Sequence, residues 1–338
     1  MIFYKIYQPQ IQNMKLRNFL LLIGVVISSS VFAIEPIDSY PSRPIKIVVP
    51  YGPGGAADQL TRIISEKLSN ELRQAIVIEN IAGGGTIIGT DKVAKALPDG
   101  YTLVLCSSTS FVNNPIFKTN LPYKVDSDFV GVGLVSASPM VLVSAPQAKF
   151  NSVSDFVRYA KENPGKVSYA SAGNGSSLQL AAELFQAQTG IKMLHIPYKS
   201  NVEATQAVLS NQVDITFDIA LSSVSLINAS KLKALGITNL KRLAILESIP
   251  TVAESGVPGF EINAWYGLAV PSGTAPEIIK KLNLALQKVT KDKDLKTKFD
   301  QLGMELLSGS SDTVMALTTK ERLSLMNLIK TRNIQIDQ

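Results

Sequence analysis

Cysteine and histidine are almost absent from this chain: its 338 residues include one of each, Cys106 and His195. A lone cysteine cannot form an intrachain disulfide, so the folded state depends on its hydrophobic cores. One histidine and one cysteine provide no spaced cluster of zinc ligands, and no EF-hand pattern occurs. A site made only of carboxylates stays open, but we expect no metal and no other cofactor. Cys106 ends the apolar run 101–105, which predicts a buried strand residue.

The single histidine also limits catalysis. A Ser-His-acid set would have to recruit His195, which lies in the apolar run 193–197. A histidine in such a strand is more often packed and hydrogen-bonded than a catalytic base, and the chain has no G-x-S-x-G sequence. The glycine run 83–85 fits no nucleotide-binding template, because Thr90 and Asp91 stand where a P-loop needs Lys and then Ser or Thr. The sequence therefore predicts no catalytic residue.

A strong excess of one charge is missing too. The formal net charge is +6, and basic and acidic residues are interleaved, as in residues 291–294. Interleaved charges are typical of a solvated helix face, so the sequence predicts no nucleic-acid partner.

Long hydrophobic runs are also lacking, since the apolar residues 19–27 are fewer than the roughly 20 that a membrane-spanning helix requires. Lys15 and Arg17 precede this run, and residues 31–33 (Val-Phe-Ala) carry short side chains at the two positions that a signal peptidase reads. The pattern predicts a cleavable signal peptide over residues 1–33, with Met14 the more natural start. Cleavage would lower the formal charge to +3. No cysteine near the cleavage site offers a lipid attachment point, so we expect an exported chain without a lipid anchor.

Two stretches of the mature chain repeat one design: an apolar strand, a glycine-rich turn without charge, and an amphipathic helix. The first combines a strand at 45–49, closed by Pro50, with a turn at 50–55 and a helix from about 56–58. The second combines a strand at 167–171, a turn at 172–176 and a helix from Ser177. Glycine lets backbone approach a ligand closely, and a helix N-terminus presents unpaired N–H groups and a positive dipole end. Two such turns facing each other would hold a carboxylate or phosphate.

The alternation of apolar runs with helical patterns predicts α/β lobes with mainly parallel sheets. Two apolar segments, at 139–144 and 264–270, interrupt the alternation and are predicted to cross between lobes. We therefore expect a discontinuous first lobe formed by residues 34–138 and 259–338, a second lobe formed by residues 139–258, and a cleft between them.

Further polar and aromatic candidates lie where strands end. Ser108 and Thr109 follow a buried strand, and Asp218 comes directly after Phe217, at the edge where open α/β sheets place ligands. Three aromatic side chains at turns or crossings could pack on a ligand, namely Tyr51, Tyr198 and Trp265.

These motifs together resemble the periplasmic solute receptors of tripartite tricarboxylate transporters, the Bug-type or TctC-like family. The resemblance covers nearly the whole mature chain in order. The motifs that carry it are residues 40–45 (YPSRPI), 53–55 (PGG) with Asp58, 98–103 (PDGYTL), 114–115 (NP), 121–123 (LPY), 164–166 (PGK), 173–176 (GNGS), 195–199 (HIPYK), 250–256 (PTVAESG) and 265–267 (WYG).

The resemblance implies a two-lobed type II periplasmic-binding-protein fold of the Venus-flytrap kind, with two crossing strands as its hinge. Such a receptor captures a small organic carboxylate in the periplasm and delivers it to one large and one small integral-membrane subunit. The implied ligand-binding residues are Tyr51, Pro53, Gly54, Gly55, Asp58, Ser108, Thr109, Ser171, Ala172, Gly173, Asn174, Gly175, Ser176, Ser177, Tyr198 and Asp218. Three residues depart from the pattern of the family: Gly52 stands where proline or alanine is common, Gln179 where histidine is frequent, and Ser200 where glycine is usual. These departures affect which ligand is expected and leave the expected fold unchanged.

The ligand class stays open at this point. If Asp218 accepts a hydrogen bond from an ammonium group of the ligand, the ligand is an amino acid. If Asp218 contacts the ligand through a water molecule, a dicarboxylate, a tricarboxylate or an aromatic acid fits equally well. Two other functions also stay open: an exported α/β enzyme that uses Asp58, Asp218 or His195 as acid or base, and a ligand-binding component of a sensor. A non-enzymatic, monomeric receptor is the leading hypothesis.

Overall fold

The computed structural model describes residues 39–332, so the predicted signal peptide lies outside the described residues. Across the described residues no helix is both long enough and apolar enough to cross a bilayer.

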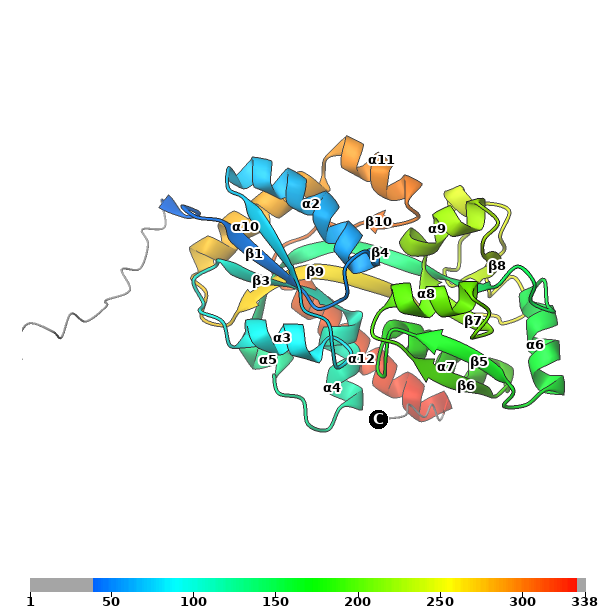
Figure 1. The fold of residues 1–338 in the computed structure, drawn as a ribbon. Coiled ribbons are helices and arrows are strands. Elements are labelled where there is room, and N and C mark those ends of the chain that lie inside the picture. Colours follow the sequence, from blue (N-terminus) through cyan, green and yellow to red (C-terminus); the bar gives the residue numbers. More distant parts are fainter. Residues whose placement is uncertain (1–38, 333–338) are drawn as a thin grey trace, which may run out of the picture. The chain divides into compact units, whose positions relative to one another are not determined.

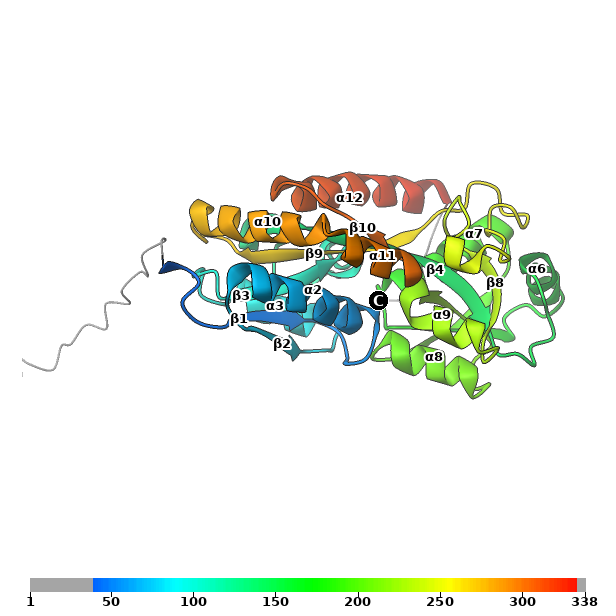
Figure 2. The same ribbon diagram turned by 90° about the horizontal axis from the view of Figure 1, so that it is seen from above.

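The strands form one continuous path in the order β2-β1-β3-β9-β4-β7-β5-β6, with β8 and β10 each pairing with β4. Figure 2 shows the first of these strands side by side. Their bounds are β1 Ile45–Val49, β2 Ile76–Asn80, β3 Thr102–Ser107, β4 Phe129–Ser144, β5 Val167–Ser171, β6 Met193–Pro197, β7 Ile215–Ile219, β8 Lys233–Ile237, β9 Asn263–Pro271 and β10 Glu305–Leu306.

Strand β4 belongs to two sheets. Its first part pairs with β9 from Phe129 to Pro139, and its last five residues, from Met140 to Ser144, pair with β7. We call the strands on the β9 side sheet A (β2, β1, β3, β9, β10 and the first part of β4) and the others sheet B (the last part of β4, β7, β8, β5 and β6). The segment 139–144, predicted to cross between lobes, is thus where β4 passes from sheet A to sheet B (Figure 1).

The expectation of mainly parallel sheets is wrong for the centre of the molecule. The outer pairs β1–β2, β1–β3, β5–β6 and β5–β7 are parallel, but every pair made by β4 or β9 is antiparallel. The physical reason is connectivity: βαβ units give parallel neighbours, whereas β4 and β9 carry the chain in opposite directions.

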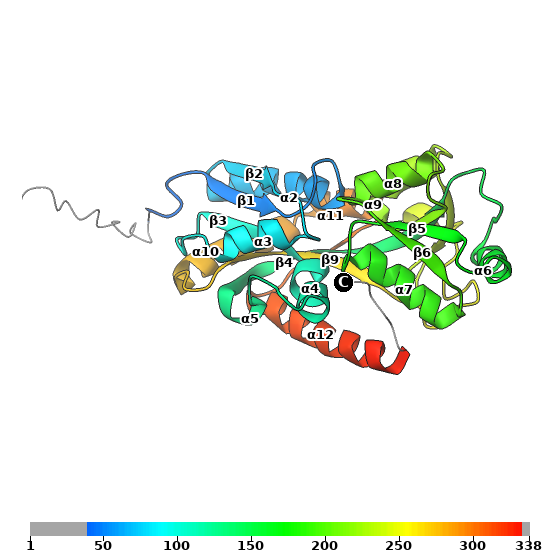
Figure 3. The ribbon, with the colours of Figure 1, turned by 60° about the horizontal axis from the view of Figure 1, so that its bottom comes forward.

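Helices cover both faces of each sheet. On sheet A, the apolar sides of α2 and α10 pack on one face, and those of α3 and α12 pack on the other. Figure 3 brings the second face forward, with α12 running along it. On sheet B, α6 and α7 lie on one face, with α8 and α9 on the other. The helix bounds are α2 Ala56–Leu72, α3 Ile87–Ala94, α4 Asn114–Phe117, α5 Val125–Asp128, α6 Val153–Glu162, α7 Ser177–Thr189, α8 Asn201–Leu209, α9 Ala220–Asn228, α10 Pro276–Thr290, α11 Lys293–Gln301 and α12 Asp312–Arg332, with the short helices η3 Ser108–Asn113 and η4 Ala244–Leu246.

Two single-copy residues lie in the core. Cys106 is fully buried in β3, as its apolar run predicts. Trp265, a candidate ligand contact by sequence, is instead buried between β9 and α12, where its Nε1–H donates to Oε2 of Glu321 at 2.6 Å. An indole N–H that is buried needs such a partner, so this contact fixes α12 to sheet A.

Candidate functional site

The N-termini of α2, α7 and α8 meet at one small cavity between the elements of sheet A and sheet B. Ala57 comes from the first turn of α2, Ser176 and Ser177 from the start of α7, and Asn201 from the start of α8. Their positive dipole ends point to one place, and no lysine or arginine lines the cavity. The complete lining is Tyr51, Ala57, Ser107, Ser108, Thr109, Ala172, Ser176, Ser177, Leu178, Asn201, Ile219, Ala264 and Tyr266.

The cavity volume is about 20 Å³. That is room for about one water molecule. The elements around it are therefore in a closed arrangement, and a small organic acid could enter only if they moved apart.

The first glycine turn is held in shape by Asp58. Oδ2 of Asp58 accepts from the backbone N–H of Gly54 at 2.8 Å and from Nε of Arg62 at 3.0 Å, and its Oδ1 accepts from Nδ2 of Asn80 at 3.1 Å. Burial raises the pKa of Asp58, but these hydrogen bonds outweigh it and leave the pKa below its ordinary value. Asp58 thus supports the turn from behind, and the N–H of Gly54 is already engaged.

The second glycine turn is held by side chains on either side of it. The N–H of Gly173 donates to Oγ of Ser171 at 3.1 Å, and the N–H of Gly175 donates to Oε1 of Gln179 at 2.6 Å. Oγ of Ser176 caps α7 by accepting from the N–H of Gln179 at 3.3 Å. The turn is therefore preorganised before any ligand arrives.

His195 completes this support, and its hydrogen bonds define its tautomer. Because Oε1 of Gln179 accepts from Gly175, the amide Nε2 of Gln179 is the group that faces Nδ1 of His195, at 3.1 Å. Nδ1 must then accept, so the proton sits on Nε2, which donates to Oγ of Ser171 at 2.6 Å. Ser171 and His195 have the spacing of a nucleophile and a base, but the histidine donates in this pair and cannot take the serine proton.

Neutral hydroxyl groups connect the two sides of the cavity. Oγ of Ser177 lies 3.0 Å from Oγ of Ser108 and 3.1 Å from Oγ1 of Thr109, and the N–H of Ser177 donates to the same Thr109 oxygen at 3.2 Å. The Tyr51 hydroxyl lies 2.7 Å from Oγ of Ser107. Burial raises the pKa of Tyr51, so this phenol stays neutral.

Asp218 is fully buried in β7 and does not line the cavity. Its carboxylate accepts from Nδ2 of Asn201 at 3.3 Å, from Oγ1 of Thr205 at 3.0 Å and from the N–H of Ile219 at 2.9 Å. Desolvation raises the pKa of Asp218 to about 6, and the three hydrogen bonds limit the rise. Asp218 therefore reaches the cavity indirectly, through Asn201 and Ile219, which both line it.

The sequence-predicted site residues fall into two groups. Six of them line the cavity: Tyr51, Ser108, Thr109, Ala172, Ser176 and Ser177. The others lie in the two turns or behind them and are not part of the lining: Pro53, Gly54, Gly55, Asp58, Ser171, Gly173, Asn174, Gly175, Tyr198 and Asp218.

Sequence reasoning missed several lining residues, of which Asn201 is the most polar. The signal was present, since Ser200 followed three residues later by Glu203 is a helix-start pattern. Oγ of Ser200 indeed accepts from the N–H of Glu203 at 3.3 Å. This cap places Asn201 at the first position of α8, facing the cavity.

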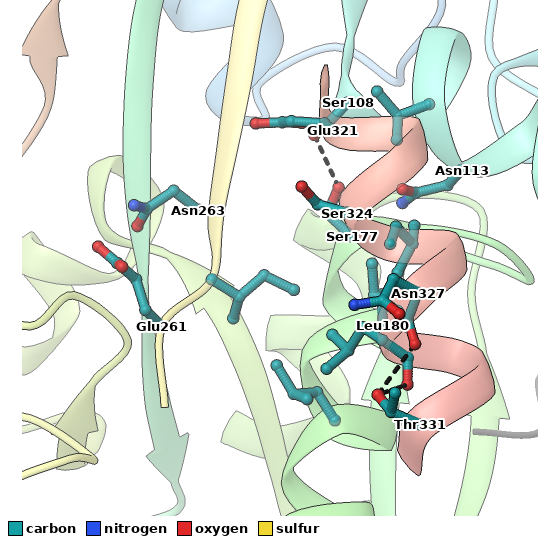
Figure 4. Close-up of a pocket in the computed structure, with 15 residues that line it drawn as sticks. Ser108, Asn113, Ser177, Leu180, Glu261, Asn263, Glu321, Ser324, Asn327 and Thr331 are labelled. Carbon is teal, nitrogen blue, oxygen red and sulfur yellow. Dashed lines mark hydrogen bonds between the residues drawn. The ribbon is translucent and has the colours of Figure 1, made fainter. Parts of the chain in front are cut away.

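A larger cavity of about 510 Å³ shares Ser108 and Ser177 with the small one. Figure 4 shows Glu321, Ser324, Asn327 and Thr331 of α12 along one side of it. Burial raises the pKa of Glu321, against the lowering effect of the Trp265 hydrogen bond. The lining of the large cavity thus contains two acidic side chains, Glu261 and Glu321, and this disfavours an organic anion there.

Comparison with known proteins identifies the family. Residues 60–334 match the family model described as the tripartite tricarboxylate transporter family receptor. The chain belongs to this receptor family. Among individual relatives, BugT of Bordetella pertussis is 34% identical over 311 residues, which cover 91% of this chain and 95% of BugT.

Solved structures of the receptor family share the fold. The Rhodopseudomonas palustris protein Rpa4515 with adipate superimposes with a TM-score of 0.85 at 30% identity, covering 87% of this chain and 99% of that one. MatC of Rhodopseudomonas palustris with bound malate gives a TM-score of 0.82 at 29% identity, covering 86% of this chain and all of MatC. The predicted two-lobed periplasmic-binding-protein fold is confirmed.

Proposed function

We propose that this protein is a periplasmic solute receptor that binds a small organic carboxylate between the two glycine turns and delivers it to two integral-membrane subunits. The observation that carries the proposal is the convergence of the α2, α7 and α8 N-termini on a cavity without a cationic side chain. Neutral N–H and O–H donors together with helix dipoles stabilise an anion without the desolvation cost of a buried ion pair. Relatives that hold adipate and malate support a carboxylate as the ligand.

The surroundings of Asp218 bear on whether the ligand carries an ammonium group. All of its hydrogen bonds go to the protein's own donors, and it is fully buried, so it offers no acceptor for a ligand ammonium group. We therefore favour a di- or tricarboxylate or an aromatic acid over an amino acid.

Capture requires opening, because the closed cavity holds about one water molecule. We propose that the lobes are residues 34–138 with 259–338, and residues 139–258. They would move about β4 and the segment that leads into β9, as in other hinge closures. The ligand contacts would come from Tyr51, Ser108, Thr109, Ala172, Ser176, Ser177 and Asn201.

The same proposal has three further parts. The chain is exported by a cleavable signal peptide over residues 1–33, it is a monomer, and it has no enzymatic activity. The hydrogen bonds of His195 support the last part, since they leave no base for Ser171. A chain that hydrolysed or rearranged the acid it binds would contradict it.

The test is a thermal-shift and calorimetric screen of residues 34–338 against adipate, malate, citrate, benzoate and glutamate, with product analysis by mass spectrometry. A ligand at about a hundredfold excess over its Kd should stabilise the protein by about 2.7 kcal/mol, a shift of several degrees. Binding of one acid without turnover would support the receptor. If nothing binds, mass spectrometry of the supernatant after denaturation distinguishes a co-purified acid from a wrong ligand class.

A further inference from the structure

Gly55 is a glycine that its own backbone does not require. It caps α2 with φ −78° and ψ 174°, an extended conformation open to any residue. A Cβ built on Gly55, however, would lie 2.5 Å from Oδ1 of Asn201. Gly55 follows β1 of sheet A, and Asn201 begins α8 beside sheet B, so the missing side chain makes room for a residue of the other lobe.

Asn201 is not free to turn away from that contact. Its Nδ2 donates to Oδ1 of Asp218 at 3.3 Å and to Oγ of Ser222 at 2.8 Å. An ionised carboxylate only accepts, so the amide nitrogen must face Asp218 and the amide oxygen must face Gly55. Rotation of Asn201 would cost hydrogen bonds to a buried, charged partner.

Neighbouring glycines do not combine these features. A Cβ on Gly52 would meet Cβ of Ser200 at 3.3 Å, a contact that a small shift relieves. Gly85, whose Cβ would lie 2.8 Å from the Asn174 oxygen, has φ +62° and so needs glycine for its backbone as well. Among these three glycines, Gly55 is the one at which a substitution leaves the local backbone conformation intact and blocks the approach of the opposite lobe.

We propose that Asn201 is a positioning residue for ligand capture: held by Asp218 and Ser222, it seats on Gly55 when the lobes close, and closure requires that position 55 carry no side chain. This inference rests on the proposed function, since closure matters only for a receptor that encloses its ligand. The inference does not depend on which acid binds, because it concerns the contact between the two lobes.

The variants are Gly55→Ala, Asn201→Ala and the double variant. Gly55→Ala should fold normally but bind the acid found in the screen about tenfold more weakly, since closure must now break the hydrogen bonds of Asn201 to Asp218 and Ser222. In the double variant the nearest atom to the new methyl is Cγ2 of Val202 at 3.6 Å, an ordinary contact, so closure should be restored. The readout of this rescue is the distance between the lobes and not the affinity, because Asn201 itself lines the cavity. Restored closure would not follow if Gly55 had only a local structural role.

Gly165→Ala is the matched control. Gly165 has φ +71° and open space around it, so alanine there strains the backbone without touching the other lobe. It should lower the Tm while leaving the ligand affinity unchanged. An equal affinity loss in Gly165→Ala and Gly55→Ala would contradict a contact-specific effect.

Distances between the lobes give a readout that needs no ligand. Spin labels on Glu66→Cys of α2 and Gln206→Cys of α8 would occupy exposed positions, while Cys106 is fully buried and burial raises the pKa of its thiol, which protects it from labelling. Wild type and the double variant should populate a shorter label distance than Gly55→Ala, with or without acid. Identical distance distributions in all three proteins would overturn the inference. Failure of every acid to bind wild type, with the shorter distance retained, would count against the proposed ligand class alone.

Discussion

Gln179 reaches back from the first turn of α7 to the residue two positions before the helix, and its Oε1 accepts from the N–H of Gly175 at 2.6 Å. The same amide presents Nε2 to His195 at 3.1 Å. One side chain therefore supports the ligand turn and sets the orientation of the imidazole behind it.

We predict that Gln179→Leu destabilises the fold. It leaves the buried N–H of Gly175 without its partner, a loss of about 1 to 3 kcal/mol in the free energy of unfolding. Urea unfolding of wild type and variant measures the loss. Gln206→Leu, an exposed change on α8, should stay within about 0.5 kcal/mol of wild type. Equal stabilities of the two variants would show that the Gln179 contact is unimportant.

Ser177→Ala should weaken carboxylate binding while the ligand-free Tm hardly moves. The variant removes the hydroxyl that contacts Ser108 and Thr109 across the cavity, and it keeps the backbone N–H of Ser177. Loss of one hydrogen bond predicts roughly a tenfold rise in Kd, measured by calorimetry. The exposed Ser127→Ala serves as control, with an unchanged Kd expected. A Kd of Ser177→Ala within twofold of wild type would remove this hydroxyl from the site.

Gly54→Ala tests the shape of the first turn. Gly54 has φ +80° with no atom within 4 Å of its Cβ position, so strain and not a clash is the expected effect. A left-handed alanine costs about 1 to 2 kcal/mol, and relief of that strain should displace the N–H that Asp58 holds. We expect weaker binding, and a smaller loss in Gly54→Asn, because asparagine tolerates this conformation better. If alanine and asparagine reduce the affinity equally, backbone conformation is not the cause.

Asp218 makes stability depend on pH. Its pKa is raised from 3.8 to about 6 in the folded state, mainly by desolvation. The folded chain therefore binds a proton more tightly than the unfolded chain, and the free energy of unfolding contributed by this group falls as pH rises from about 4 to 6. The shift corresponds to a loss of about 3 kcal/mol in total.

The measurement is urea unfolding between pH 4 and 8 for wild type and Asp218→Asn. The stability of wild type relative to the variant should decline through this window and then level off above about pH 7. A difference that rises with pH would mean that the Asp218 pKa is lowered rather than raised. A carbon-13 NMR titration of the Asp218 carboxyl gives an independent value if the variant folds poorly.

Much of this structure follows from local sequence. The strands predicted at 45–49 and 167–171 are β1 Ile45–Val49 and β5 Val167–Ser171, and the helix predicted from Ser177 is α7 Ser177–Thr189. The glycine turns, the caps and the buried Cys106 also follow from the sequence, because each depends on neighbours a few positions away. The motifs that follow one another from residues 40–45 to 265–267 indicated the family.

The tertiary structure alone decided which of those residues meet. Strand β4 pairs with β9 in sheet A and with β7 in sheet B, and the fold brings Asn201 to Gly55 although 146 positions separate them in the chain. The tertiary structure also turns the Asp58 carboxylate toward its own turn and buries Asp218 outside the cavity lining, whereas the family resemblance implied that both are ligand-binding residues. Periodicity and turn chemistry encode local conformation, but the side of a turn that a carboxylate faces depends on the packing of distant strands, which no local pattern contains.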